Sequence, residues 1–84
     1  MAEAFVLINT EVGGEGEVLK ALLQIEGVEE AYVVYGVYDI VAKIKAPDIE
    51  SLKNIVTTNI RKLSKVKSTL TMVVVDGKRI AHTR

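Results

Sequence analysis

The order of strand-type and helix-type segments is the feature that most constrains the fold of this chain. Four short runs are rich in β-branched and aromatic residues, as buried strands are; they cover residues 4–8, 31–35, 39–45 and 66–75. Residues 18–25 and 49–63 instead repeat their apolar side chains at the spacing of amphipathic helices. The sequence therefore predicts the order β-α-β-β-α-β, with turn residues between the segments.

Turn chemistry supports these boundaries. Gly27 is predicted to end the first helix, because glycine is the usual residue in a left-handed helix cap. Asp48 is placed to cap the start of the second helix. Only residues 36–38 separate the second and third strands, so these strands are predicted to be antiparallel neighbours. A later aspartate–glycine pair is a hairpin dipeptide, which predicts that residues 78–82 fold back as a short edge strand.

The predicted order is the split βαβ, or ferredoxin-like, arrangement of the α+β class. Because strand crossovers of this kind are right-handed, both helices are expected on one face of a four-stranded antiparallel sheet. A chain of 84 residues has the size of one domain, so residues 1–84 are expected to form a single domain.

Apolar residues occupy both faces of the predicted sheet. In the first strand Phe5 and Leu7 point to one face. Val6 and Ile8 point to the other, and residues 70–75 alternate in the same way. Helices can cover only one face, and the remaining apolar patch is larger than a monomer usually exposes. We therefore expect a second copy to pack face to face about a two-fold axis, giving a homodimeric α/β sandwich-barrel.

Composition excludes several classes of function. Eleven basic and eleven acidic residues balance, so the net charge draws the chain to neither nucleic acid nor a membrane. Without cysteine there is no thiolate ligand or thiol nucleophile. The one histidine, His82, lies near the C-terminus without a partner group for catalysis. We expect a soluble, cytoplasmic protein with no catalytic residues, no metal site, no cofactor, and no direct contact with nucleic acid or membrane.

Charge is nonetheless uneven along the chain. Residues 1–40 hold eight acidic residues and one basic residue, whereas residues 41–84 hold ten basic and three acidic residues. In one interpretation the two halves fold against each other and the basic residues form a solvated helix end. In the other interpretation, four basic side chains form an anion-binding patch; these are Arg61, Lys62, Lys65 and Lys67.

Two clusters stand out from the apolar strands. The first follows the second strand and consists of Tyr35, Gly36, Val37, Tyr38 and Asp39. The second lies near the start of the last strand and consists of Ser68, Thr69, Leu70 and Thr71. Each cluster has a structural and a functional interpretation, and both stay open at this point.

In the structural interpretation, Gly36 takes a positive φ in a hairpin turn, Asp39 caps that turn, and the hydroxyls of the second cluster face solvent. In the functional interpretation, Gly36 lets a ligand approach the backbone and Asp39 binds a cation. The hydroxyls then supply hydrogen bonds to a zwitterion. Tyr35 and Tyr38 offer flat apolar walls to such a ligand.

The two clusters together resemble a known family. Residues 33–41 and 66–74 resemble the effector-binding (RAM) domain of the Lrp/AsnC family, and the resemblance extends over nearly the whole chain. Its most specific elements are a Gly-x-x-Asp turn, from Gly36 to Asp39, and a Val-x-x-Thr-x-Thr pattern that begins at Val66. Regulators of this family carry an N-terminal helix-turn-helix domain, for which the sequence leaves no length. A stand-alone RAM protein is therefore expected.

The resemblance implies that two chains pair through their sheets and that the dimers associate into an octamer or a similar ring. It also implies that an amino-acid effector binds between dimers. The residues carried over are Gly36, Val37, Tyr38 and Asp39 together with Ser68, Thr69, Leu70 and Thr71. Backbone N–H groups and hydroxyls suit the carboxylate of such an effector, and the Asp39 carboxylate suits its ammonium group.

The leading hypothesis is a non-enzymatic amino-acid-sensing module that oligomerises and modulates Lrp/AsnC transcription regulators, for example by co-assembling with full-length members. One alternative is a dimeric α+β barrel enzyme of the oxygenase or isomerase type, since fold does not fix function. Such an enzyme needs a polar pocket between sheet and helices, where the sequence places only aliphatic side chains. A second alternative is a purely structural oligomerisation module.

Overall fold

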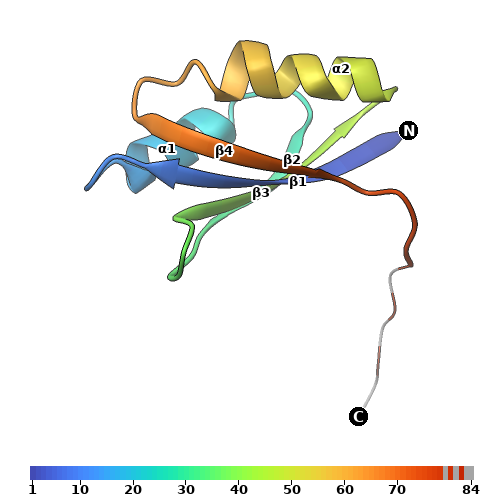
Figure 1. Cartoon of the computed structure of the whole chain (residues 1–84), viewed down its shortest axis with the longest axis horizontal. Helices are drawn as coiled ribbons and strands as arrows, with labels where there is room; N and C mark the ends of the chain where they lie inside the picture. The colour runs from blue at the N-terminus through green and yellow to red at the C-terminus, as the bar shows by residue number, and fades with distance from the viewer. Residues whose placement is uncertain (79, 81, 83–84) are drawn as a thin grey trace.

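A computed structural model describes residues 1–78, 80 and 82 of the chain (Figure 1). Its strands are β1 (Ala2–Thr10), β2 (Val28–Val33), β3 (Ile40–Ala46) and β4 (Val66–Val73). Its helices are α1 (Glu15–Leu22) and α2 (Ile49–Asn54), the second continued by the π-helical segment η1 (Ile55–Ile60). The predicted β-α-β-β-α-β order and the ferredoxin-like α+β class are confirmed.

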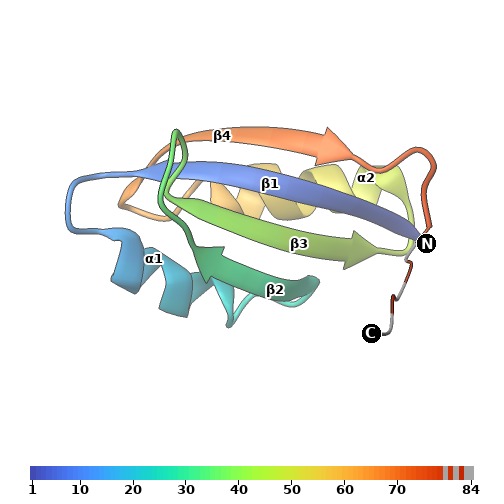
Figure 2. The same ribbon diagram turned by 90° about the horizontal axis from the view of Figure 1, so that it is seen from below.

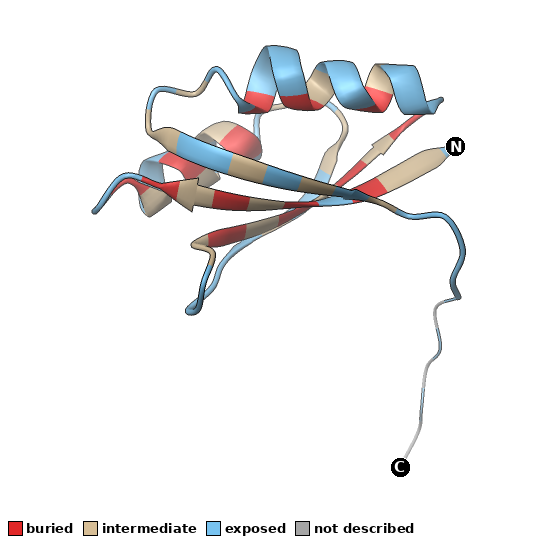
Figure 3. Cartoon of the chain, viewed as in Figure 1, coloured by how far each residue is buried: buried red, intermediate tan, exposed pale blue. Residues whose placement is uncertain are grey.

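The four strands pair in the order β2-β3-β1-β4, and every neighbouring pair is antiparallel (Figure 2). Both helices lie on one side of this sheet, as the handedness of the crossovers predicts (Figure 1). The helix-facing side of the sheet contributes to the core Ala4, Val6, Ile8, Ile40, Ala42, Ile44 and Ala46. The helices contribute Val18, Leu22, Leu52, Val56 and Ile60, which lie on the sides turned toward the sheet (Figure 3). Each large aliphatic side chain buried in this way stabilises the fold by about 1.5–3 kcal/mol.

The strands adjoining the first predicted cluster have different boundaries from those predicted. The second strand was expected to reach residue 35, but β2 ends at Val33. The Val34 N–H donates to the Asp39 carbonyl at 2.9 Å, which is the last hydrogen bond before the chain leaves the ladder. The connection is therefore six residues long, 34–39, rather than a tight hairpin turn.

The last strand is also shorter than predicted, and the expected edge strand is not seen. Pairing of β4 ends where its partner β1 begins, with the Val74 N–H donating to the Glu3 carbonyl at 2.9 Å. Residues 74–78 then lead away from the sheet (Figure 1). In the predicted edge strand at residues 78–82, the described residues 78, 80 and 82 are not in a strand, and the other two lie outside the described part of the chain.

Gly27 has the predicted left-handed backbone but a different position relative to the helix. The first helix ends at Leu22, so Gly27 is not its cap. With φ of 102°, Gly27 instead turns the chain into β2, and its carbonyl accepts the Lys45 N–H at 2.8 Å. A Cβ at this position would lie 2.7 Å from Ile55 Cδ1. Glycine is thus required here both by the φ angle and by the space.

The second helix begins as predicted and ends differently. The Asp48 carboxylate accepts the Ser51 backbone N–H at 2.7 Å, which confirms Asp48 as the N-cap. The helix ends at Ile60 rather than at residue 63, and its last turn is wider than an α-turn because the Arg61 N–H donates to Val56, five residues back, at 2.9 Å.

The capping bond makes the stability of the fold depend on pH. The Ser51 N–H holds the pKa of the Asp48 carboxyl below its ordinary value of 3.8. The stabilisation that this capping bond gives the fold is therefore complete when the pH is above the ordinary pKa. It is lost as the pH falls through the lower pKa of the folded state. We expect Asp48→Ala to lower the melting temperature at neutral pH and to cost progressively less below pH 3.8. Melting curves that stay separated by the same amount throughout would contradict this origin.

Candidate functional site

The face of the sheet that points away from the helices, here called the open face, carries a row of apolar side chains across all four strands. Tyr32 lies opposite Val41, Val41 opposite Leu7, and Leu7 opposite Leu70. Tyr32 and Leu70 are 56% and 46% exposed in the isolated chain. Phe5 lies in the next row and is also exposed. The prediction of apolar residues on both faces is therefore right for the centre of the sheet.

The open face also has charged groups that the apolar pattern did not reveal. Lys43 and Lys45 each lie 3.6–4.0 Å from the carboxylates of Glu3 and Glu29, so the four form a quartet of alternating charge near the start of β1. At the edge of the sheet the Tyr32 hydroxyl donates to the Glu30 carboxylate at 2.9 Å, which raises the pKa of that hydroxyl. The open face is thus an apolar centre with a charged border.

The loop of residues 34–39 carries the first predicted cluster and projects on the side opposite the helices (Figure 1). Tyr35 and Val37 stand in solvent. Gly36 does not have a positive φ, so the expectation of a left-handed turn there is wrong. The six-residue connection, 34–39, reverses the chain without a left-handed residue at position 36. A Cβ on Gly36 would also meet no atom within 4 Å, so nothing described in the chain itself requires glycine at this position.

Asp39 holds the loop to the end of β1. Its carboxylate Oδ2 accepts the Thr10 backbone N–H at 2.8 Å and lies 3.4 Å from the Thr10 hydroxyl oxygen. Its own backbone N–H donates to the Ile8 carbonyl at 2.9 Å. The expectation that Asp39 caps its own turn is therefore wrong, because its carboxylate accepts the backbone N–H of the neighbouring strand instead. Among the described residues these side-chain bonds use Oδ2 alone, so Oδ1 keeps its lone pairs for another donor.

The second predicted cluster is divided between the two faces of the sheet. Thr69 and Thr71 lie opposite Ile8 and Val6, so their side chains point to the helix side. Ser68 and Leu70 point to the open face, where the Ser68 hydroxyl lies 3.5 Å from the Asn9 amide nitrogen. A ligand within one chain therefore cannot meet all four side chains on the same face.

The two predicted clusters share one end of the sheet but are separated by β1. Thr10 lies between them, because it bonds to Asp39 on one side and pairs with Val66 on the other. In the described part of the chain, the side-chain hydrogen bonds join Asp39 to Thr10 and Ser68 to Asn9, and link neither cluster to the other. Within one chain, both halves of the expected site lie at the same end of the sheet, but they do not come together around a ligand.

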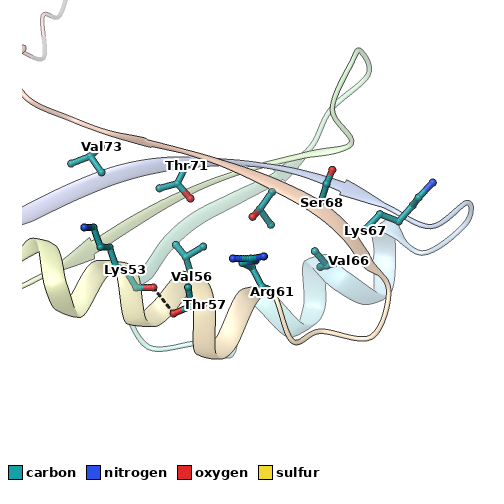
Figure 4. Close-up of a pocket in the computed structure, with 10 residues that line it drawn as sticks. Lys53, Val56, Thr57, Arg61, Val66, Lys67, Ser68, Thr71 and Val73 are labelled. Atoms are coloured by element: carbon teal, nitrogen blue, oxygen red, sulfur yellow. Dashed lines mark hydrogen bonds between the residues drawn. The ribbon is translucent and has the colours of Figure 1, made fainter.

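A groove of about 690 Å³ lies on the helix side, between β4 and the α2–η1 helix (Figure 4). Its walls are Lys53, Val56, Thr57, Arg61, Val66, Lys67, Ser68, Thr69, Thr71 and Val73. Sequence reasoning missed Lys53 and Thr57, although they precede Arg61 at intervals of four residues, which places them along one helix face. In the predicted basic patch, Lys65 instead forms an ion pair with Glu17 at 3.1 Å.

The βαββαβ fold, with helices on one face of the sheet and an apolar centre on the open face, defines a small α+β domain of ferredoxin-like type. The family model described as the Lrp/AsnC ligand binding domain matches residues 3–82. The chain therefore belongs to the Lrp/AsnC family, through its ligand-binding domain.

Individual relatives agree with this assignment. An uncharacterised helix-turn-helix-type transcriptional regulator of Pyrococcus furiosus is 36% identical over 73 residues, which is 83% of this chain and 49% of the regulator. The chain thus spans about half the length of that relative. The crystal structure of FFRP-DM1 is 40% identical, with a TM-score of 0.86, and the match covers 89% of this chain and 100% of FFRP-DM1.

A more distant structure shows the same fold. The feast or famine regulatory protein of M. tuberculosis, complexed with L-methionine, is 21% identical with a TM-score of 0.81, and the match covers 100% of this chain and 56% of that protein. Within the part of the chain that the structure describes, no helix is both long and apolar enough to cross a membrane.

Proposed function

We propose that this protein is a non-enzymatic, cytoplasmic effector-binding module that responds to an amino acid and modulates transcription regulators of the Lrp/AsnC family. Membership of the family and the regulators among its relatives support the regulatory role. The observation that carries the proposal is Oδ1 of Asp39, which accepts no hydrogen bond from the described residues and lies beside an exposed aromatic loop at an end of the sheet. The L-methionine bound by the distant M. tuberculosis protein has the ammonium and carboxylate groups that such a site would bind.

The proposed site combines the loop of residues 35–39 from one subunit with residues 68–71 of another. The separation of these clusters by β1 supports a shared site, in which the second half comes from a neighbouring copy. Asp39 binds the ammonium group of the effector. Loop N–H groups and the Ser68 hydroxyl bind its carboxylate, and Tyr35 covers its side chain. Residues at a subunit junction exclude water, which strengthens each of these polar contacts.

In this proposal the chains assemble through their open faces. Two copies pack their Tyr32–Val41–Leu7–Leu70 rows against each other about a two-fold axis, and the dimers join into a ring of octamer type. An effector shifts this assembly only as far as it binds one state more tightly than the other. Full-length regulators with the same domain can join such a ring as partners.

The aliphatic core supports a role without catalysis. Between sheet and helices, Thr10 is the one buried polar side chain among the described residues. The helix-side groove between β4 and the helix is polar, contrary to the expectation of only aliphatic side chains there, but the polar groups among its described residues are basic side chains and hydroxyls, without a carboxylate or a histidine. A barrel enzyme of this fold needs an acid, a base or a ligand set inside that space. Within the described residues, no three metal-ligating side chains gather.

The test uses Asp39→Asn, because the amide oxygen still accepts the Thr10 N–H while the negative charge is removed. Titration calorimetry of the native protein against the twenty amino acids identifies the effector. We expect Asp39→Asn to weaken its binding by about tenfold or more, as losing a charge-assisted hydrogen bond does. The melting temperature is expected to stay close to that of the native protein.

The matched control is Asp76→Asn, which makes the same change at an exposed site outside the loop. It is expected to leave binding unchanged. Equal weakening by both variants would contradict a specific role for Asp39. If the native protein gives no heat with any amino acid while remaining assembled, it is a structural oligomerisation module instead.

A further inference from the structure

We propose that the helix-side groove is a second binding site, specific for a small organic oxyanion and anchored by Arg61. This groove is lined by β4 on one side and by the α2–η1 helix on the other (Figure 4). Thr69 and Thr71 also belong to the 68–71 segment of the proposed amino-acid site, but their side chains point to the helix side, away from Ser68 and Leu70. Arg61 belongs to the groove alone, so its variants test the groove separately from the amino-acid site.

Arg61 lies directly after the π-helical segment. Its backbone N–H bonds to Val56, five residues back, so Arg61 lies one wide turn beyond Val56. In an α-helix that place would belong to residue 60. Figure 4 shows the Arg61 guanidinium between Val56 and Val66. A π-helical segment is rare and often occurs at functional sites, because it redirects one side chain out of the regular helical pattern.

The charge of the groove has one sign. Lys53, Arg61 and Lys67 line it, and no acidic residue does. In the part of the chain that the structure describes, none of these three has a carboxylate within 4.0 Å, whereas Lys65 pairs with Glu17. Arg61 and Lys53 point along the groove, and Lys67 points outward at its end (Figure 4). A concave surface with this charge concentrates anions.

The remaining walls define the kind of anion. Thr69 and Thr71 turn their hydroxyls to the helix side, opposite Arg61. A guanidinium donates two parallel hydrogen bonds to a carboxylate or a phosphate, and hydroxyls complete the set. Val56 and Val73 give the groove apolar surface for a carbon skeleton. Its volume of about 690 Å³ lies within the range of small-molecule sites.

The experiment follows melting of the full chain while inorganic phosphate or succinate is added, with sodium chloride at the same ionic strength as the reference. An anion that binds the folded state stabilises it by RT ln(1 + c/Kd), where c is the anion concentration, so the rise of the melting temperature with c gives an apparent dissociation constant. We expect at least one of the two anions to stabilise beyond chloride. Phosphate alone indicates a phosphate ester as ligand, and succinate alone indicates a carboxylate.

The deciding comparison is between Arg61→Gln and Lys62→Gln. Lys62 is the adjacent residue, is exposed and does not line the groove, so both variants remove one positive charge from the same helix end. Arg61→Gln is expected to raise the apparent dissociation constant by about tenfold or more, and Lys62→Gln by less than about twofold. Thr71→Val, which keeps the shape of the side chain, is expected to weaken binding several-fold.

Three results overturn the proposal. In the first, neither anion stabilises the protein more than chloride does. In the second, Arg61→Gln and Lys62→Gln weaken binding equally, which indicates diffuse charge attraction only. In the third, Arg61→Gln changes the sedimenting mass without added anion, which makes the groove a contact between subunits. None of these results bears on the Asp39→Asn titration, so failure here and failure of the amino-acid site remain distinguishable.

Discussion

Leu70→Lys is expected to sediment as a single chain, whereas the native protein is expected to sediment as the proposed dimer or a larger assembly. Leu70 ends the apolar row of the open face and is 46% exposed in the isolated chain, so lysine fits the monomer fold. In the proposed dimer the same change buries a charge at two symmetry-related places, at a cost of several kcal/mol each. The dissociation constant of the dimer should therefore rise more than about a hundredfold. Sedimentation velocity over a dilution series measures it.

Leu23→Lys is the matched control, because Leu23 is 54% exposed and caps α1, away from the open face. It is expected to keep the native mass, and both variants are expected to keep the native circular dichroism spectrum. If Leu70→Lys remains assembled, the open face is not the interface. A native chain that is monomeric at high concentration would contradict the pairing altogether.

Gly27→Ala is expected to destabilise the fold by roughly 2–5 kcal/mol, since backbone strain and overpacking act together. An alanine would have to hold φ near 102°, which side chains with a Cβ rarely adopt. Its Cβ would also lie 2.7 Å from Ile55 Cδ1 and 3.1 Å from the Lys45 carbonyl oxygen. In a domain of this size the melting temperature should fall by more than about 10 °C. Urea denaturation supplies the free energy of unfolding.

Gly36→Ala provides the comparison for that variant. Its φ is not positive, and a Cβ there meets no atom within 4 Å. The free energy of unfolding is expected to stay the same or rise slightly, because alanine restricts the unfolded chain. If Gly27→Ala lowers the free energy of unfolding no more than Gly36→Ala does, the crowding at Gly27 is relieved at little cost.

The fold could be predicted from the sequence because spacing and turn chemistry agree. Asp48 caps the second helix and Gly27 takes the left-handed backbone before β2, both as their residue types predict. The exact ends of β2 and β4 could not be predicted, because they depend on where the partner strand starts. The π-helical segment was equally hidden, since the apolar residues of 49–63 fit an ordinary helix.

The sequence singled out candidate site residues, but it could not show how they are arranged. Asp39 was expected to cap its own turn, whereas its carboxylate bonds to Thr10, a contact between distant segments that no local pattern reveals. The four residues 68–71 share a sequence motif, whereas strand alternation sends Thr69 and Thr71 to the groove and the other two to the open face. A local pattern identifies such residues, and only the strand register shows which face each of them serves.

The charge quartet gives the open face a direction. A row of aliphatic side chains alone can slide or rotate against its copy at little cost, because dispersion contacts have no preferred angle. Glu3, Glu29, Lys43 and Lys45 lie toward only one end of that row. A dimer arrangement that buries these charges without a partner of opposite sign costs free energy. An arrangement that leaves them in solvent or facing opposite charges does not. In the proposed dimer the quartet would therefore favour one crossing angle between the two sheets, and added salt would weaken that preference.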